Sequence, residues 1–174
     1  MLRIIADSTC DISKEDARKM GIQIVPISVR FGNEEFLDGV EITHEEFYTR
    51  LAECDELPKT SQPSPDTFMK VFNEAVAAGD DVLGIFISSD LSGTYQSACL
   101  AALDVEEETG KKLYMVDSRS ASIGTALLIR EAVKLREAGG IENYEEAARL
   151  RDMIHQLKKM DNTDDSTQGG GHDA

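Results

Sequence analysis

The stretch ISSDLSGTYQSA, residues 87–98, brings several hydroxyls and one glycine together directly after an apolar run, with no lysine or arginine among them. Hydroxyls and backbone amides at the start of a helix can donate hydrogen bonds to an anion. Ser92 and Gly93 are the central candidates, because a residue without a side chain lets a ligand approach the backbone closely. Ser89 and Thr94 flank them. The helix end carries only about half a unit of positive charge, so such a site suits one carboxylate better than a triphosphate.

Three other polar segments follow apolar runs or enter helices in the same way. They are Asp7-Ser8-Thr9, Thr60-Ser61-Gln62 and Asp117-Ser118-Arg119-Ser120. In a doubly wound α/β sheet, ligands bind outside the carboxyl ends of the strands, where such segments would converge. The alternative is that Ser, Thr and Asp merely cap helices, which they do better than other residues. The residue pattern leaves both interpretations open, although several such loops at one edge favour a ligand site.

The chain between these segments predicts strands that alternate with helices. Buried strands are expected at residues 2–6, 82–87 and 112–116, with a further β region and hairpin across residues 22–37. Helices are expected at residues 13–20, 43–53, 64–78, 94–108, 122–138 and 143–157. Thr43 with Glu46 forms a capping-box pattern, and Ser64 before Pro65 is a strong helix start. The expected fold class is α/β, a three-layer sandwich with a mostly parallel sheet.

The chain of 174 residues predicts one well-cored domain, residues 1–160, followed by a tail, residues 161–174. The tail holds Asn, Asp, Ser, Thr, Gln and a Gly triplet, and it lacks core residues before Ala174. We therefore expect an acidic, Gly-rich, disordered tail.

Composition excludes several classes of function. The net charge of -15 argues against nucleic-acid or anionic-membrane binding, because neutralising phosphates requires clustered Lys and Arg. The acidity most simply keeps the protein soluble. Cys10, Cys54 and Cys99 have no C-x-x-C spacing and predict reduced thiols in a cytoplasmic protein. The apolar start stops at Asp7, too early for a signal or a membrane span, so no stable membrane insertion is expected.

Other chemistries have weaker support in the sequence. Neither glycine-rich nucleotide motif is present, and the surroundings of Ser92 are not the G-x-S-x-G elbow of hydrolases. No His/Cys/carboxylate set has the spacing of metal ligands. An enzyme of acyl or phosphoryl transfer that uses Asp7, Ser92 or Arg119 remains an alternative hypothesis.

Four motifs in series carry a resemblance. ADSTCDI, KTSQPSPDTF, ISSDLSGTYQSA and MVDSRSAS, which begin at Ala6, Lys59, Ile87 and Met115, together resemble the amino-terminal domain of the DegV family. The similarity covers residues 2–160. It implies a bacterial cytosolic protein that binds a long-chain fatty acid and requires no cofactor. Similar proteins are the non-catalytic subunit of fatty acid kinase and present the carboxylate to a separate kinase subunit.

The resemblance also implies roles for particular residues. Thr60 and Ser61 match hydroxyls that contact the carboxylate, and Ser92 with the amide of Gly93 matches the element on its other side. Ser89 and Thr94 are secondary candidates. Family members continue into a second α/β domain, whereas this sequence stops resembling them at Met160, so we expect that domain to be absent. An inactive fragment is a further alternative, and self-association through an uncovered apolar face is expected.

Overall fold

The structure is a computed structural model, and it describes residues 1–139. In chain order the elements are β1 (Leu2–Asp7), the short 3-10 helix η1 (Ser8–Cys10), α1 (Lys14–Met20), β2 (Ile22–Val25), β3 (Ser28–Phe31), β4 (Glu34–Leu37), α2 (His44–Glu53), β5 (Lys59–Ser61), α3 (Pro65–Ala77), β6 (Asp81–Phe86), α4 (Thr94–Thr109), β7 (Leu113–Asp117) and α5 (Ile123–Glu137). The predicted final helix, residues 143–157, and the predicted tail, residues 161–174, lie outside the described residues.

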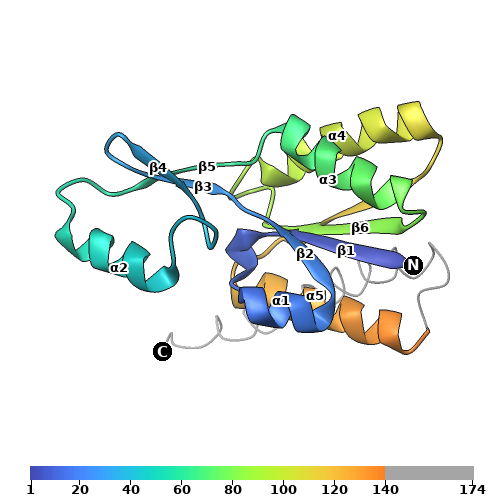
Figure 1. Ribbon diagram of the computed structural model, residues 1–174, viewed down its shortest axis with the longest axis horizontal. Helices are drawn as coiled ribbons and strands as arrows, with labels where there is room; N and C mark the ends of the chain where they lie inside the picture. Colours follow the sequence, from blue (N-terminus) through green and yellow to red (C-terminus); the bar gives the residue numbers. More distant parts are fainter. Residues whose placement is uncertain (140–174) are drawn as a thin grey trace, which may run out of the picture.

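The main body is a three-layer α/β sandwich (Figure 1). Its sheet has four parallel strands in the order β2-β1-β6-β7, so the first strand of the chain is central. Helices α3 and α4 cover one face, and α1 and α5 cover the other. The predicted fold class is therefore confirmed. Every parallel strand of this sheet ends at the same edge, which is where the predicted polar segments that begin at Asp7, Ser88 and Asp117 lie.

Two apolar cores hold the layers together. The core under α3 and α4 includes Phe68, Phe72 and Phe86, whose side chains are fully buried, and the ring of Phe68 contacts the other two rings. The core under α5 includes Ile4, Leu83 and Ile129, also fully buried. Burying one such side chain stabilises the fold by about 1.5–3 kcal/mol. The cores thus fix the sheet and its helices, and with them the loops at the strand ends.

A smaller unit, which we call the arm, extends from this body (Figure 1). It consists of the antiparallel sheet β4-β3-β5 and helix α2, packed around Val29, Phe31 and Ile42. The turn between β3 and β4 is formed by Gly32 and Asn33, and Gly32 takes the left-handed backbone region, with φ 57°. The hairpin predicted there is confirmed.

The arm also shows where the sequence-based expectations differ from the structure. The apolar run at residues 22–31 divides at Pro26, so β2 joins the main sheet and β3 joins the arm. Proline has no N–H for a ladder hydrogen bond, which explains the division. Residues Lys59–Ser61, expected as a loop that enters a helix, form β5 because they pair with β3. The hydroxyls of Thr60 and Ser61 are therefore positioned by a sheet.

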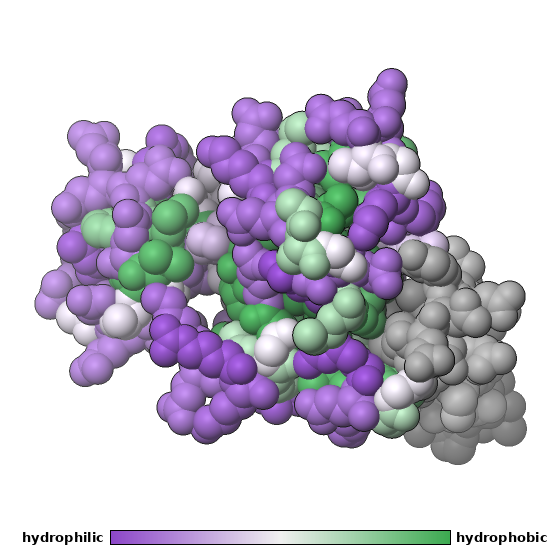
Figure 2. Space-filling view, turned by 45° about the vertical axis from the view of Figure 1, so that its right-hand side comes forward, coloured by the Kyte–Doolittle hydropathy of each residue, from purple (hydrophilic) through white to green (hydrophobic). Residues whose placement is uncertain are grey.

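A cleft lies between the arm and the main body, and Figure 2 shows the hollow with hydrophobic residues on its walls. Its volume is about 670 Å³. Its apolar walls come from Ile12 and Ala17 near α1, Ile22 and Ile24 on β2, and Val40 before α2. Within residues 1–139, the structure contains no helix with the length and apolar character needed to cross a membrane.

Candidate functional site

The start of α4 is the centre of the candidate site. Its N-cap residue is Gly93, which makes no side-chain capping bond. The hydroxyl of Ser92 accepts a hydrogen bond from the Thr94 amide (3.2 Å) and lies 2.9 Å from the Thr94 hydroxyl. Ser92 and Gly93 are partly exposed, whereas Thr94 is fully buried. Because α4 has 16 residues, its amino end attracts an anion, and Ser92 and Gly93 are the residues that an anion can reach.

Strand β5 brings the second pair of predicted residues to this helix. Thr60 pairs with Val29 and Ser61 pairs with Ser28, and both Thr60 and Ser61 are exposed. Consecutive strand residues project to opposite faces, so the two hydroxyls leave β5 on opposite sides. The next residue, Gln62, donates from its Nε2 to the hydroxyl of Ser97 on α4 (3.1 Å). Gln62, the residue after Thr60 and Ser61, therefore bonds to the helix whose start follows Ser92 and Gly93.

Gln62 is a residue that the sequence-based reasoning missed. A Cβ atom on Gly93 would overlap Oε1 of Gln62 and would lie 2.9 Å from its Cδ atom. Gly93 was predicted to leave its backbone open to a ligand, and the structure shows a neighbouring side chain over it. The available signal was the position of Gln62 inside the TSQPS motif, between the hydroxyls and Pro63.

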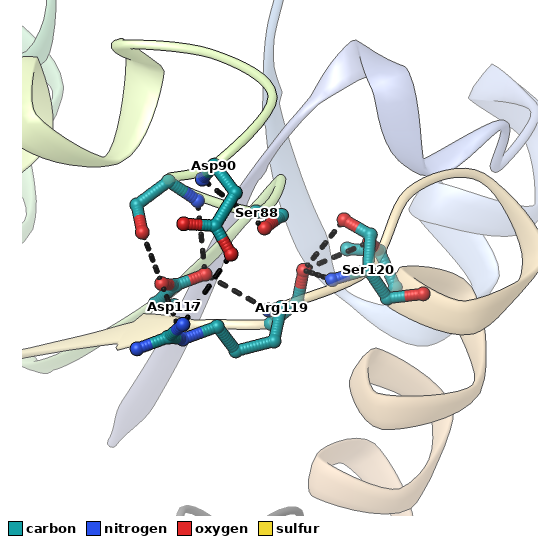
Figure 3. A network of polar contacts seen from close by, with 8 residues as sticks. Ser88, Asp90, Asp117, Arg119 and Ser120 are labelled. Atoms are coloured by element: carbon teal, nitrogen blue, oxygen red, sulfur yellow. Dashed lines mark hydrogen bonds and ion pairs between the residues drawn. The ribbon is translucent and has the colours of Figure 1, made fainter. Parts of the chain in front are cut away.

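The secondary candidate Ser89 is hydrogen-bonded to the carboxylate of Asp117. Figure 3 shows this carboxylate beside Arg119 and Asp90. The Ser89 hydroxyl donates to Asp117 (2.6 Å), and the Ser89 amide donates to the same side chain (3.1 Å). Arg119 forms ion pairs with Asp117 (3.0 Å) and with Asp90 (3.4 Å). The loops after β6 and β7 are thereby joined, and the charge of Arg119 is offset by two carboxylates. Ser89 is therefore oriented by Asp117 at the outer side of this edge.

Asp7 ties the central strands together at the same edge. Its carboxylate accepts hydrogen bonds from the amide of Ile87 (2.9 Å) and from the amide and hydroxyl of Thr9. The side chain is fully buried, and this burial raises the pKa of the carboxyl above its ordinary value, against the opposing effect of those hydrogen bonds. Asp7 therefore links the end of β1 to the residue after β6. This structural role argues against Asp7 as the nucleophile of an acyl- or phosphoryl-transfer enzyme.

Backbone strain collects in the loops around the edge. Among residues 1–139, the residues other than glycine with positive φ are Asp11 (54°), Arg119 (52°) and Ser122 (52°). All three follow the carboxyl ends of β1 or β7. Left-handed backbone is costly for residues with a Cβ and is concentrated at functional sites. The strain supports this edge of the sheet as the functional one.

The cleft beside the arm is a separate feature from this head-group region. Its lining includes Ser8 from the strand-end loops, but it does not include Thr60, Ser61, Ser92 or Gly93. The cleft adjoins α1 and the start of α2, whereas β5 leads to α3 and contacts α4 (Figure 1). We place the candidate site at the start of α4, because the donors for an anion are there.

Metal ligation has no support in the part of the chain that the structure describes. Across residues 1–139, no group of three or more His, Cys, Asp or Glu side chains is arranged to hold a metal ion. His44, in the first turn of α2, is exposed. The chemistry of the site is thus that of neutral donors: the Ser92 hydroxyl, the amides that start α4, and the hydroxyls of β5.

Comparison with solved structures identifies proteins with the same fold. A stearic acid-binding protein of Eubacterium ventriosum has a TM-score of 0.79 and 37% identity, and the match covers 87% of this chain and 52% of that one. DegV of Bacillus subtilis, a fatty acid binding protein, has a TM-score of 0.80 and 27% identity, with 91% and 54% covered.

The sequence comparisons agree. A DegV domain-containing protein of Clostridium perfringens is 38% identical over 171 residues, which is 97% of this chain and 60% of that protein. The chain thus spans about half to three fifths of the length of these proteins. The family model described as an uncharacterised protein of the DegV family matches residues 1–160. On the fold, the sequence and the strand-end motifs together, the chain belongs to the DegV family.

Proposed function

We propose that this chain binds the carboxylate of a long-chain fatty acid at the amino end of α4. Thr60 and Ser61 on β5, with Ser92 and the amide of Gly93, are the proposed ligands, and Ser89 and Thr94 are secondary ones. The observation that carries the proposal is the α4 start, where the N-cap residue Gly93 has no side chain and the partly exposed Ser92 lies beside it. Two proteins of the same fold are fatty-acid-binding proteins, which supports the same ligand class here.

The proposed role is that of a carrier without catalysis of its own. Neutral hydroxyls and amides hold a carboxylate without the short charge-assisted ion pair that would lower its reactivity. A carboxylate held in this way remains a nucleophile for the γ-phosphate of ATP in a partner kinase subunit, in the cytoplasm of a bacterium. No cofactor is required, because the partner supplies the ATP and its metal ion.

A direct test is a comparison of oleate with methyl oleate. The purified chain is delipidated, and the extract is analysed by mass spectrometry for a co-purified fatty acid. The chain is then titrated with each ligand, since the ester keeps the acyl chain but removes the charge. We expect oleate to bind at least about tenfold more tightly, the effect of one hydrogen bond to a charged group. Equal affinity for the two ligands would overturn the carboxylate site.

The enzyme hypothesis is tested in the same preparation. Acyl esters and ATP are supplied to the chain without any partner, and hydrolysis or phosphoryl transfer is measured. The carrier proposal expects no turnover above that of the Ser92→Ala variant. Turnover that depends on Ser92 or Asp7 would support acyl or phosphoryl transfer in place of binding.

The length of the chain bears on affinity. A saturated acyl chain gains about 0.8 kcal/mol for each methylene that is buried. Relatives are nearly twice as long, and the primary candidate residues do not line the cleft. We therefore propose that the chain binds oleate more weakly than a full-length relative, or binds it after self-association. Sedimentation with and without oleate tests this, and a monomer that binds as tightly as a full-length relative would contradict it.

A further inference from the structure

The contact between Gln62 and Gly93 joins two elements that are far apart in the sequence. Gln62 follows β5 directly, and Gly93 is the N-cap residue of α4. The side-chain amide of Gln62 occupies the space that a side chain on Gly93 would fill. Gly93 has φ -75°, which any residue can adopt, so its backbone conformation does not require glycine. The space beside Gly93 is taken by the end of the Gln62 side chain, which a side chain at position 93 would have to move.

The second half of the contact is buried in α4. Nε2 of Gln62 donates to the hydroxyl of Ser97 (3.1 Å), and Ser97 is only 3% exposed. The amide of Ser97 in turn donates to the carbonyl of Gly93 (2.9 Å), which closes the first turn of the helix. Gln62 therefore packs on Gly93 and bonds one turn further along the same helix. Two points of attachment fix both the position and the direction of its carboxamide.

The chain around Gln62 has little freedom to compensate for a loss of this contact. On one side Thr60 and Ser61 are paired with β3. On the other side Pro63 is buried, and Ser64 caps α3 by accepting from the amide of Thr67 (3.2 Å). The segment from β5 to α3 thus meets α4 through Gln62, with the proposed hydroxyl ligands immediately before it.

We infer that Gln62 is a positioning residue that sets the spacing between the hydroxyls of β5 and the start of α4, and that Gly93 is a glycine to accommodate it. The positioning role rests on the proposed function, whereas the steric coupling of the two residues does not. Gly93→Ala displaces the carboxamide at the end of the Gln62 side chain and with it the hydrogen bond to Ser97. In a chain that already carries Gln62→Ala, the same alanine at position 93 has room.

A four-protein cycle tests this inference: wild type, Gln62→Ala, Gly93→Ala and the double variant. Each single variant should lose about tenfold or more in oleate affinity, comparable to one hydrogen bond to a charged group. The double variant should bind oleate no more weakly than Gln62→Ala, and methyl oleate affinity should be the same in all four. Gln23→Ala on β2, whose side chain lines the cleft and not the start of α4, serves as the matched control and should behave as wild type.

Gln62→Glu separates positioning from simple support of the fold. Glutamate keeps the shape of glutamine and can accept from the Ser97 hydroxyl, so the melting temperature should stay close to that of wild type. Its charge beside Gly93 should weaken oleate binding progressively as the pH rises through the carboxyl pKa, and methyl oleate binding should not change. Oleate affinity of Gln62→Glu that does not vary with pH would overturn the placement of Gln62 beside the ligand.

The positioning role of Gln62 and its steric contact with Gly93 are tested separately. If the wild type does not distinguish oleate from methyl oleate, the proposed function fails, and the positioning role of Gln62 fails with it. Urea unfolding of the same four proteins then still decides the contact. If the losses in unfolding free energy of the two single variants add up to the loss in the double variant, the steric link between Gln62 and Gly93 is overturned. A double variant that loses less than this sum would support the link.

Discussion

The helices of this molecule begin in two different ways. Helices α1, α2 and α3 begin with a side-chain cap, provided by Ser13, Thr43 and Ser64. Helices α4 and α5, which follow the parallel strands β6 and β7, begin without one. A cap uses an oxygen of the protein to satisfy the first amides of a helix. At α4 and α5 the N-cap residue supplies no such oxygen, and at α4 the Ser92 hydroxyl, one residue earlier, accepts from the Thr94 amide. Both starts lie at the edge of the sheet where ligands bind in folds of this class.

The difference shows where serine and threonine serve structure and where they serve a site. The capping explanation holds for Thr43 and Ser64, whose hydroxyls accept from the amides of Glu46 (3.2 Å) and Thr67 (3.2 Å). Ser92 precedes the N-cap position, which Gly93 occupies. The same residue type thus closes the start of α3 and, in our proposal, supplies a ligand donor at the start of α4.

The largest effect that we expect to distinguish the two kinds of helix start is on ligand affinity. Ser92→Ala should weaken oleate binding by about 1.5–3 kcal/mol, the range for a hydrogen bond to a charged group. The unfolding free energy should change by about 1 kcal/mol at most, because the Ser92 hydroxyl bonds only within its own turn. Calorimetric titration of the delipidated protein measures the first quantity, and urea unfolding measures the second.

Unchanged oleate affinity in a folded Ser92→Ala protein would remove this residue from the site. The paired variants Thr60→Val and Ser61→Ala extend the test to β5. Because the two side chains leave opposite faces of the strand, we expect one of these substitutions to weaken binding much more than the other.

A capped helix start should give the opposite result. Ser64→Ala removes the cap of α3 and should lower the unfolding free energy by about 1 kcal/mol, the usual cost of a lost N-cap. Oleate affinity should remain at the wild-type value, because this hydroxyl is used within the protein. A thermal melt and a titration on the same sample check both quantities. If Ser64→Ala lost affinity without losing stability, the two kinds of helix start would no longer be distinct.

The smallest expected effect is a pH dependence at the cap of α2. The amide of Thr43 and then its hydroxyl donate to Glu46, and these hydrogen bonds lower the pKa of that carboxyl below its usual 4.5. A lowered pKa in the folded state means that the stabilisation is present above the unfolded value and is lost as the pH falls through the folded value. Glu46→Gln should therefore be less stable than wild type at neutral pH, and this difference should shrink below about pH 4.5.

Urea unfolding of wild type and Glu46→Gln between pH 7 and pH 3 is the measurement. Glu45→Gln, in the same turn of α2, is the matched control, because it removes the same charge and leaves the capping box intact. A difference between wild type and Glu46→Gln that grows on acidification would contradict the role of the carboxylate in the cap.

Local features of the fold could be predicted from the sequence because their causes are local. Ser64 before Pro65, Thr43 with Glu46, and Gly32 with Asn33 each act within a few residues, and each is confirmed. The fold class followed from the alternation of strands and helices. The candidate ligands came from four short motifs, and their role in binding stays a prediction. The structure shows that Gln62, the residue after Ser61, contacts Gly93 and Ser97.

The features that were missed depend on contacts between distant residues. Strand β5 is polar and has three residues, so its pairing with β3 is what makes it a strand. The division of the run at residues 22–31 had a local signal in Pro26, but the assignment of β3 to a second sheet did not. Gln62 lies 31 residues before Gly93, and a side-chain contact over that separation leaves no local pattern.

The order of strands in the main sheet has a consequence for how the chain acquires its structure. Strand β1 lies between β2 and β6, and its register with β6 pairs Leu2 with Asp81. Contacts across such sequence separations are formed late and slowly, because the long intervening loop must first be closed. During synthesis, β1 can pair only with β2 until residues 81–86 have emerged from the ribosome. The backbone edge of β1 that pairs with β6 therefore stays open until then, and β1 becomes a central strand only when β6 has been added.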